Sequence, residues 1–259
     1  TTGTGVHRPA LSVLIAVRGA LPSLRPAERR VAEAVLADPA GISESSITTV
    51  ARLCQTSETT VLRFCRAIGL TGYPELRIAL ARAAQFEETD QDRGAPLTDD
   101  IAANDPLTDI VAKITHADAR AITDTAATLD LAMLQKAVDA LVGAGRVDIY
   151  GVGASGLVGT DLHHKLHRLG LVSFIATDAR SALSSAALLG PGDVALGISH
   201  TGTTADVVDA LREARRHGAT TIAVTNYARS SITTEADLVL ITAARETTFR
   251  TGATASRSA

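Results

Sequence analysis

The sequence predicts two domains of different class, an all-α helix-turn-helix domain followed by an α/β domain with a five-stranded parallel sheet flanked by helices. Apolar residues recur at helical spacing through the first third of the chain. Beyond residue 145, short buried-strand segments alternate with segments of helical composition, as in parallel sheets covered on both faces. A stretch rich in Asp, Glu, Gly, Thr and Pro separates the two patterns and is typical of a linker.

These patterns divide the chain into a helix-turn-helix domain at residues 1–85, an acidic linker with a connecting helix at 86–128, and the α/β domain at 129–259. Charge follows this division, since the first 85 residues hold ten arginines and no lysine against six acidic residues. A basic first domain is compatible with binding to phosphate groups. The chain starts at Thr1 without a Met and stops in the run 254–259, so a truncation at the C-terminus stays open.

Composition argues against a membrane protein and against a metalloprotein. No apolar run approaches the roughly 20 residues of a membrane-spanning helix, and we find no secretory signal, so we expect a cytoplasmic protein without a membrane partner. Cys54 and Cys65 are expected to be small buried side chains, and nothing supplies the four ligands of a zinc site. We therefore expect neither a metal nor another cofactor.

The first domain is predicted to begin with helices over residues 11–40, with Pro26 at a first helical position and the pair Asp38-Pro39 as a stop. A short loop, with or without a helical turn, is expected at 42–47. The last helix of this domain is predicted over residues 73–84.

Between these helices lies a helix-turn-helix pattern. A short helix capped by Thr48 or Thr49 is predicted through Cys54, and Ser57 caps the next helix, because its hydroxyl can accept a hydrogen bond from a free backbone N–H. In such motifs the second helix lies in the major groove, with its first residues facing base edges, and arginine pairs with guanine or phosphate. The residues predicted to contact DNA are Ser57, Thr59, Thr60, Arg63 and Arg66 of the second helix and Arg52 of the first. The alternative is an amphipathic helix with two solvated arginines.

Three segments of this region carry a family resemblance. The runs Leu24–Glu33, Thr59–Gly69 and Gly72–Arg77 resemble the N-terminal domain of RpiR-family bacterial transcription regulators, over about residues 11–85. The resemblance implies that this domain binds operator DNA, as a dimer or larger assembly.

The second domain alternates helices and strands. Helices are predicted at 107–127 and 130–143, and strands at 147–150, 172–176, 194–198, 221–224 and 238–241. Two of these strands end in loops rich in Gly, Ser and Thr, residues 151–155 and 199–204. Gly153 lets the backbone approach a ligand closely, the N–H groups that open a helix attract anions, and parallel sheets bind ligands at the C-terminal ends of their strands. The loops therefore favour a phosphate site, with helix capping as the simpler alternative.

Two other interpretations of this domain stay open on the sequence. Residues 151–156 also match the G-x-G-x-x-G pattern of dinucleotide-binding folds, and Asp178 lies about 25 residues after the second glycine. His163 and His167 share a helical face, but no third ligand is apparent, so we expect solvent-facing or interface histidines rather than a metal site.

The segment from about Leu129 to the chain end resembles the SIS, or sugar isomerase, domain, through the two loops and the run Val224–Asn226. The ligand-binding residues that this resemblance implies are Ser155, Ser199, Thr201 and Thr204 at the phosphate of a sugar phosphate, with Glu246 aligned to the family's sugar-facing glutamate. Glu246 is equally plausible as a surface residue. His200, inside the second loop, either contacts sugar hydroxyls or caps the strand end.

Two functions compete on these grounds. The first is a DNA-binding transcription regulator of sugar metabolism genes whose SIS domain senses a phosphorylated sugar. The alternative is a phosphosugar aldose–ketose isomerase with Glu246 as base and a histidine such as His200 as acid. An isomerase has no use for a recognition helix, so we expect a regulator without catalysis. Its expected partners are operator DNA, a sugar-phosphate effector and further copies of itself, in a homodimer or higher homo-oligomer.

Overall fold

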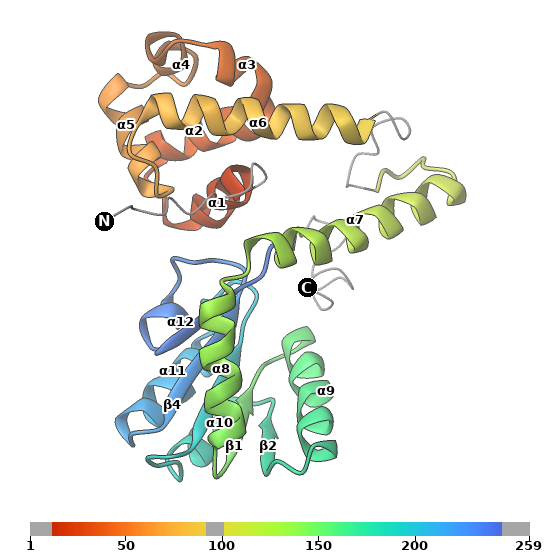
Figure 1. Cartoon of the computed structure of the whole chain (residues 1–259), viewed down its shortest axis with the longest axis vertical. Helices are drawn as coiled ribbons and strands as arrows, with labels where there is room; N and C mark the ends of the chain where they lie inside the picture. Colours follow the sequence, from red (N-terminus) through yellow and green to blue (C-terminus); the bar gives the residue numbers. More distant parts are fainter. Residues whose placement is uncertain (1–11, 92–100, 245–259) are drawn as a thin grey trace, which may run out of the picture. The chain divides into compact units, whose positions relative to one another are not determined.

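The computed structural model describes residues 12–91 and 101–244 (Figure 1). The chain divides into two compact units, residues 1–97 and 98–259. Helices alone make up the described part of the first unit, and the second contains a parallel sheet, so the predicted fold classes are confirmed.

The first unit is built of helices that share one apolar core. Its fully buried side chains include Val17, Val31, Phe64 and Leu80, which come from four helices far apart in the sequence. The elements are α1 (Ser12–Ala20), η1 (Leu21–Ser23), α2 (Pro26–Ala37), α3 (Pro39–Glu44), α4 (Ile47–Leu53), α5 (Glu58–Ala67) and α6 (Tyr73–Gln91).

Asp38 ends α2 as predicted, but it also starts another helix. Its carboxylate accepts a hydrogen bond from the backbone N–H of Gly41 at 2.8 Å, which caps α3. The loop predicted at 42–47 is therefore shorter than expected, since only Ser45 and Ser46 lie outside helices there and residues 42–44 take the helical option that the prediction left open.

Two further helix ends differ from the prediction. Ser46 caps α4, with its Oγ 3.1 Å from the backbone N of Thr49, so neither Thr48 nor Thr49 is the cap. Helix α6 continues to Gln91 instead of ending near residue 84. Both α5 and its cap Ser57 agree with the sequence prediction.

The second unit alternates strands and helices after two leading helices. Its elements are α7 (Leu107–Thr128), α8 (Leu131–Gly143), β1 (Val147–Tyr150), α9 (Ala154–Arg168), β2 (Ser173–Ala176), α10 (Ala179–Ala186), β3 (Val194–Ile198), α11 (Ala205–Arg216), β4 (Thr220–Thr225), α12 (Ser231–Thr234) and β5 (Leu238–Ile241). No helix in the described part of either unit is long and apolar enough to cross a membrane.

The five strands form one parallel sheet in the order β2-β1-β3-β4-β5. From β1 the chain crosses to β2 on one side, and it then returns to β3 on the other side of β1. The strand order therefore reverses between β1 and β3, where Tyr150 pairs with Gly197. Doubly wound sheets bind ligands at such a reversal, outside the C-terminal ends of the strands.

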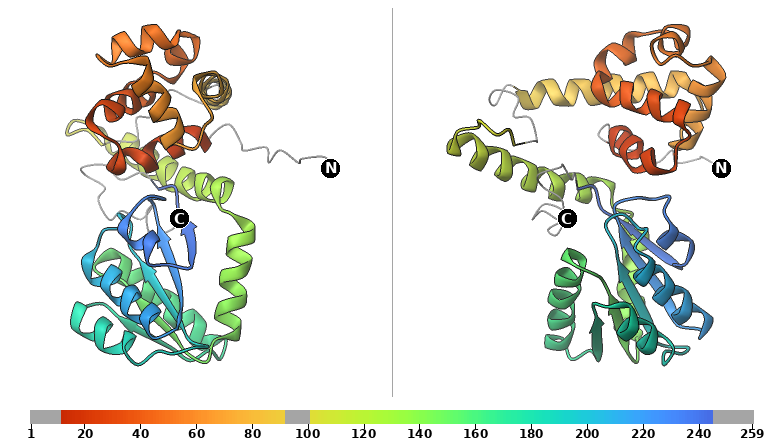
Figure 2. Two further views of the ribbon diagram at one scale, coloured as in Figure 1. Left: turned by 90° about the vertical axis from the view of Figure 1, so that its left-hand side faces the viewer. Right: turned by 180° about the vertical axis from the view of Figure 1, so that it is seen from behind.

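Helices cover both faces of this sheet, as predicted (Figure 2). On one face α8 and α9 pack through residues such as Ala137 and Leu166. On the other face α10, α11 and α12 pack through Ala182, Leu211 and Ile232. Loops at the C-terminal strand ends thus lead into helices on opposite faces.

The strand order also overturns the dinucleotide-binding alternative. The order 2-1-3-4-5 is that of flavodoxin-like sheets, whereas the Rossmann order is 3-2-1-4-5-6. Asp178, the acidic residue that this alternative needed for a ribose, instead caps α10 by accepting a hydrogen bond from the Ser181 N–H at 2.9 Å. The hydrogen bonds with Ser181 lower the pKa of Asp178, as expected of a capping carboxylate.

Candidate functional site

In the first unit, α4 and α5 form the predicted helix-turn-helix. Thr56 closes the turn by donating its backbone N–H to the Ala51 carbonyl at 2.8 Å, and Gln55 adopts the left-handed conformation with φ of 49°. Arg30 of α2 donates from Nε to the Cys54 carbonyl and from Nη2 to the Gln55 carbonyl, both at 2.9 Å. A single guanidinium therefore holds the strained turn, a contact that the sequence analysis missed.

Helix α5 buries one face and exposes the other. Val61, Phe64 and Cys65 lie in the core, and burial raises the pKa of Cys65 to about 11, so its thiol stays protonated at neutral pH. Thr59, Arg63 and Arg66 are exposed and fall on the opposite side at helical spacing. Ser57 and, on α4, Arg52 are exposed as well.

Thr60 is the predicted DNA contact whose placement differs from the others. It is only 4% exposed and lies on the inward side of α5. Its Oγ1 is 3.0 Å from the Ser57 hydroxyl and accepts a hydrogen bond from Arg63 Nη2 at 3.3 Å. This position favours support of Arg63 over direct contact with a base.

In the second unit, the first loop runs from β1 into α9 through three glycines, of which Gly151 and Gly156 are closely packed. Gly153 is the N-cap of α9 and has a positive φ of 61°. A Cβ on Gly151 would lie 2.8 Å from the Ser155 carbonyl oxygen, and a Cβ on Gly156 would lie 2.8 Å from that of Gly151. Only glycine fits these positions, and the tight turn leaves Ser155 half-buried in the first turn of α9.

The second loop leads from β3 into α11 and is organised by Ser199. This residue is buried, its Oγ lies 2.9 Å from Thr204 Oγ1, and it accepts the Gly202 N–H at 3.1 Å. Thr201 is exposed, and its hydroxyl accepts a hydrogen bond from that of Thr203 at 3.0 Å. The predicted hydroxyl residues thus do gather around the start of α11.

A third loop, after β4, supports the second. The carbonyl of His200 accepts hydrogen bonds from the Asn226 N–H at 3.0 Å and from Thr225 Oγ1 at 3.2 Å. The ring of His200 meets that of Tyr227 edge-on, with centroids 5.8 Å apart. The backbone of Gly202, in the second loop, lies so close to Ser230 that a Cβ added to Gly202 would lie 2.5 Å from the Ser230 Cβ.

Asn226 connects this loop system to the segment that follows β5. Its Oδ1 accepts hydrogen bonds from the Ala244 N–H at 2.8 Å and from Thr242 Oγ1 at 3.2 Å. The neighbouring Ala243 N–H donates to Thr125 Oγ1 of α7 at 2.9 Å, in a buried position. Glu246, the predicted sugar-facing residue, lies outside the described residues.

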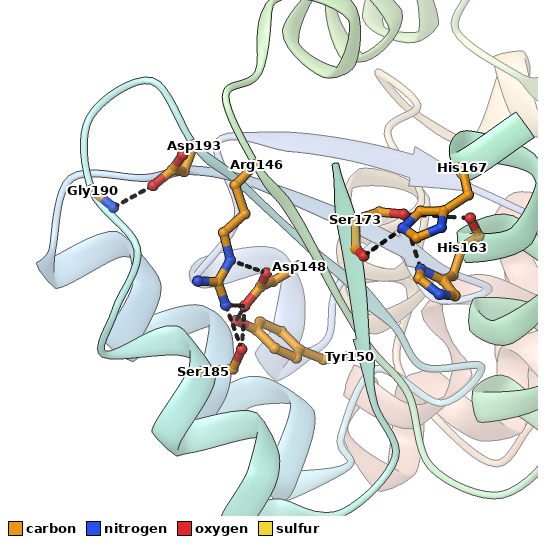
Figure 3. Close-up of polar contacts among 9 residues, drawn as sticks. All are labelled: Arg146, Asp148, Tyr150, His163, His167, Ser173, Ser185, Gly190 and Asp193. Carbon is orange, nitrogen blue, oxygen red and sulfur yellow. Dashed lines mark hydrogen bonds and ion pairs between the residues drawn. The ribbon is translucent and has the colours of Figure 1, made fainter. Parts of the chain in front are cut away.

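A buried polar group on β1 precedes the first loop (Figure 3). Arg146 donates from Nε and Nη2 to the two carboxylate oxygens of Asp148, at 2.7 and 2.9 Å, and from Nη2 to Ser185 of α10 at 2.9 Å. Tyr150 donates to Asp148 at 3.3 Å, and burial followed by the Asp148 charge raises the pKa of Tyr150. This paired group fixes β1 against α10.

The histidines of α9 take part in packing against β2 (Figure 3). His163 Nδ1 lies 2.9 Å from Ser173 Oγ, and His167 Nε2 lies 3.1 Å from the Ser173 carbonyl oxygen. Burial, followed by the neighbouring His167 and His164, lowers the pKa of His163. Over residues 12–91 and 101–244, no group of three His, Cys, Asp or Glu side chains could hold a metal ion.

Known proteins resemble both units. Residues 12–87 match the helix-turn-helix domain of the rpiR family, and residues 140–259 match the SIS domain. An HTH-type transcriptional regulator of Caldanaerobacter subterraneus subsp. tengcongensis is 38% identical over 247 residues, which cover 95% of this chain and 86% of that protein. The chain belongs to the rpiR family of helix-turn-helix transcription regulators. Another member, YbbH of Bacillus subtilis, is 31% identical over 250 residues, 96% of this chain and 85% of YbbH.

Solved structures agree with this RpiR-type architecture. The Vibrio vulnificus NanR protein, complexed with ManNAc-6P, matches 95% of this chain and 86% of its own with a TM-score of 0.56 and 28% identity. The sugar isomerase domain of an RpiR transcription factor from Sphaerobacter thermophilus matches 54% of this chain and 78% of its own, with a TM-score of 0.52 and 28% identity.

The tight second loop of the regulator predicts a sharp difference between two glycines. Gly202 has a φ of +66° and lies against Ser230, so Gly202→Ala should lower the free energy of unfolding by about 1–3 kcal/mol. Gly190→Ala is the matched control, because its Cβ would meet nothing within 4 Å, and its effect should be near zero or slightly stabilising. Urea unfolding followed by circular dichroism measures both, and equal stabilities would contradict the close approach of the two loops.

Proposed function

We propose that α5 reads operator DNA and that the loops after β1 and β3 bind the phosphate of a sugar-phosphate effector. The observation that carries the proposal is that two features occur on one chain of the rpiR family. Helix α5 exposes a face with Thr59, Arg63 and Arg66, and the edge of the parallel sheet after β1 and β3 is lined with hydroxyl groups. The first suits a DNA groove and the second suits a phosphate. The protein is then a ligand-controlled regulator of sugar metabolism genes.

The phosphate assignment rests on two helix N-termini and the hydroxyls between them. Helix α9 starts at Ala154 after Gly153, and α11 starts at Ala205 after Thr204, both at the point where the strand order reverses. Helix N-termini attract anions through free N–H groups and the helix dipole. The ManNAc-6P bound by NanR is a phosphorylated sugar, which supports a ligand of this class for the present chain.

An isomerase remains the second candidate because SIS domains also occur in enzymes. The relatives named above are transcriptional regulators, which favours an effector that is bound and not converted. We therefore propose that this chain has no isomerase activity. Incubation with fructose 6-phosphate and similar sugar phosphates, followed by chromatography, should show no conversion of the sugar. A gel-shift assay of the same protein with operator DNA should show binding.

Arg63→Ala and Arg66→Ala should each weaken operator binding without unfolding the protein. Loss of a base contact is expected to weaken binding by about 1–3 kcal/mol at one base position. Fluorescence anisotropy at fixed salt measures the affinity, and circular dichroism checks the fold. Arg82→Ala, an exposed arginine on α6, is a control for the loss of charge. Unchanged affinity of both α5 variants would remove α5 as the recognition helix.

Ser155→Ala and Ser199→Ala should weaken sugar-phosphate binding and leave DNA affinity without ligand unchanged. Each removes a hydrogen bond to a charged group, typically about 1.5–3 kcal/mol. Calorimetry with ManNAc-6P and a panel of other sugar phosphates measures the loss. Ser185→Ala would be a poor control because Ser185 is bonded to Asp148. Ser43→Ala is a better one, because Ser43 is a half-buried serine of the other unit whose hydroxyl donates to the Ala40 carbonyl of its own helix. Equal affinity for a sugar and its phosphate would contradict the phosphate site.

We further propose that effector binding reaches α7 through a short series of hydrogen bonds. The series runs from the His200 carbonyl to Asn226, from the Asn226 amide oxygen to Ala244, and from the adjacent Ala243 to Thr125. Every bond in it is 3.0 Å or shorter. Along the chain, residues 92–106 separate the end of α6 from the start of α7, so we propose that a shift of α7 is passed along the chain to the DNA-binding domain.

One helix-turn-helix reads only a few base pairs, so specific binding normally needs two copies related by symmetry. We therefore propose a homodimer or larger homo-oligomer that binds an operator with two half-sites. In such an assembly, effector-dependent movement of α7 would change the spacing of the two DNA-binding domains. Sedimentation that shows a monomer still bound tightly to its operator would contradict this assembly.

Thr125→Val should reduce the coupling between the two ligands while leaving each binding site in place. Coupling between sites is typically about 1–3 kcal/mol and must be reciprocal. In the wild type, operator DNA should change the affinity for the sugar phosphate, and the sugar phosphate should change the affinity for DNA by the same factor. In Thr125→Val this factor should approach one. Thr123→Val is the matched control, since its exposed hydroxyl donates to the Ala119 carbonyl of α7 at 3.0 Å and has no other hydrogen bond within residues 12–91 and 101–244. An unchanged factor in Thr125→Val would exclude this route.

A further inference from the structure

A nearly buried carboxylate lies against the arginine proposed to read DNA. Glu28, at the third position of α2, is only 8% exposed. Its Oε2 accepts the backbone N–H of Arg25 at 3.2 Å, which caps the helix, and its Oε1 lies 3.6 Å from Nε of Arg63. The Arg63 side chain itself is 48% exposed, so one partner of this ion pair is covered and the other reaches solvent.

Arg63 is held on a second side by its own helix. Its Nη2 donates to Thr60 Oγ1 at 3.3 Å, and that hydroxyl is in turn 3.0 Å from the Ser57 hydroxyl. Among the described residues, the Nη1 group of Arg63 has no hydrogen-bond partner. Because the guanidinium is planar and rigid, the two contacts set the direction of its remaining N–H groups.

Helix capping alone does not require a charge at residue 28. Glutamine can also fill this position of a capping box, because the backbone N–H needs only an acceptor oxygen, although a carboxylate gains in addition from the helix dipole. A carboxylate that is mostly removed from water is unfavourable unless it is paired, and Arg63 is the paired cation that the structure places beside it. Beyond the N-terminus of its own helix, the negative charge of Glu28 acts on Arg63.

We propose that Glu28 is a positioning residue for operator recognition, which rests on the proposed role of α5. Glu28 and Thr60 together orient the Arg63 guanidinium so that its free edge faces a base and pairs with guanine. The carboxylate also offsets part of the Arg63 charge, which limits its attraction to phosphates of any sequence. Glu28 thus increases the difference between specific and non-specific binding, without touching DNA itself.

Glu28→Gln tests this assignment because the amide keeps the cap and removes the charge. The probe is a duplex selected from a random-sequence pool by the wild-type protein, together with single base-pair variants of it and an unrelated duplex of equal length. We expect discrimination at one base pair of each half-site to fall about five-fold or more, the scale of one bidentate contact. Affinity for the unrelated duplex should stay equal or increase. Glu33→Gln, at an exposed glutamate of the same helix, controls for the change in net charge and should leave discrimination as in the wild type.

Two further variants make the outcome specific to Arg63. Thr60→Val removes the second contact of the Arg63 guanidinium and should weaken discrimination at the same base pair. This variant also provides the test if Glu28→Gln proves unstable. In the Arg63→Ala background, Glu28→Gln should have no further effect on discrimination. The proposal would be overturned if Glu28→Gln discriminated between base pairs as well as the wild type does. It would also be overturned if Glu28→Gln lowered discrimination as much in the Arg63→Ala background as in the wild type. Failure of the wild type to select any sequence would instead contradict the function proposed for α5.

Discussion

The parallel pairing of β1 with β3 is the constraint on which the proposed phosphate site depends. The two strands run side by side to the pair Tyr150–Gly197, so the loops that follow them open at the same edge of the sheet. Helix α9 then packs on one face and α11 on the other, because their apolar residues belong to different core clusters. Two helix N-termini from opposite faces therefore meet at the reversal of strand order, and a phosphate can be approached from both sides.

Helix α2 has the corresponding role in the DNA-binding unit. Arg30 holds the carbonyls of the turn between α4 and α5, where Gln55 is in the left-handed conformation that non-glycine residues seldom adopt. Glu28, one half-turn earlier, meets Arg63 on the outward face of α5. One helix thus contacts both the turn that precedes α5 and the arginine on its outward face, so under the proposed function α2 would support recognition without contacting DNA itself.

Much of this architecture could be predicted from local sequence patterns. The five strands, the Ser57 cap and the Gly-rich loops each depend on a few consecutive residues, and all were predicted within one or two positions. The helix starts at Pro39 and Ile47 were missed, because Asp38 and Ser46 compete as caps with neighbouring Asp, Ser and Thr residues that have the same preference. The inward position of Thr60 was also missed, since helical spacing alone does not say where a buried face ends.

The contacts that no local pattern predicts are those that join distant segments. Thr125 and Ala243 are 118 residues apart, and Glu28 and Arg63 belong to different helices, so nothing in either segment alone indicates the other. The first of these contacts lies wholly within the second unit, where it connects the segment after β5 to α7. Ala243 and Ala244 donate consecutive backbone N–H groups in different directions, one to α7 and one to Asn226. Under the proposed function, a displacement of Asn226 with the loop after β3 would stretch its bond to Ala244 or move the segment after β5, and its bond to Thr125, with it. Ala243, Ala244 and Thr125 are all buried, where an unmade hydrogen bond is costly, so the proposed coupling requires α7 to follow the loop with both bonds intact.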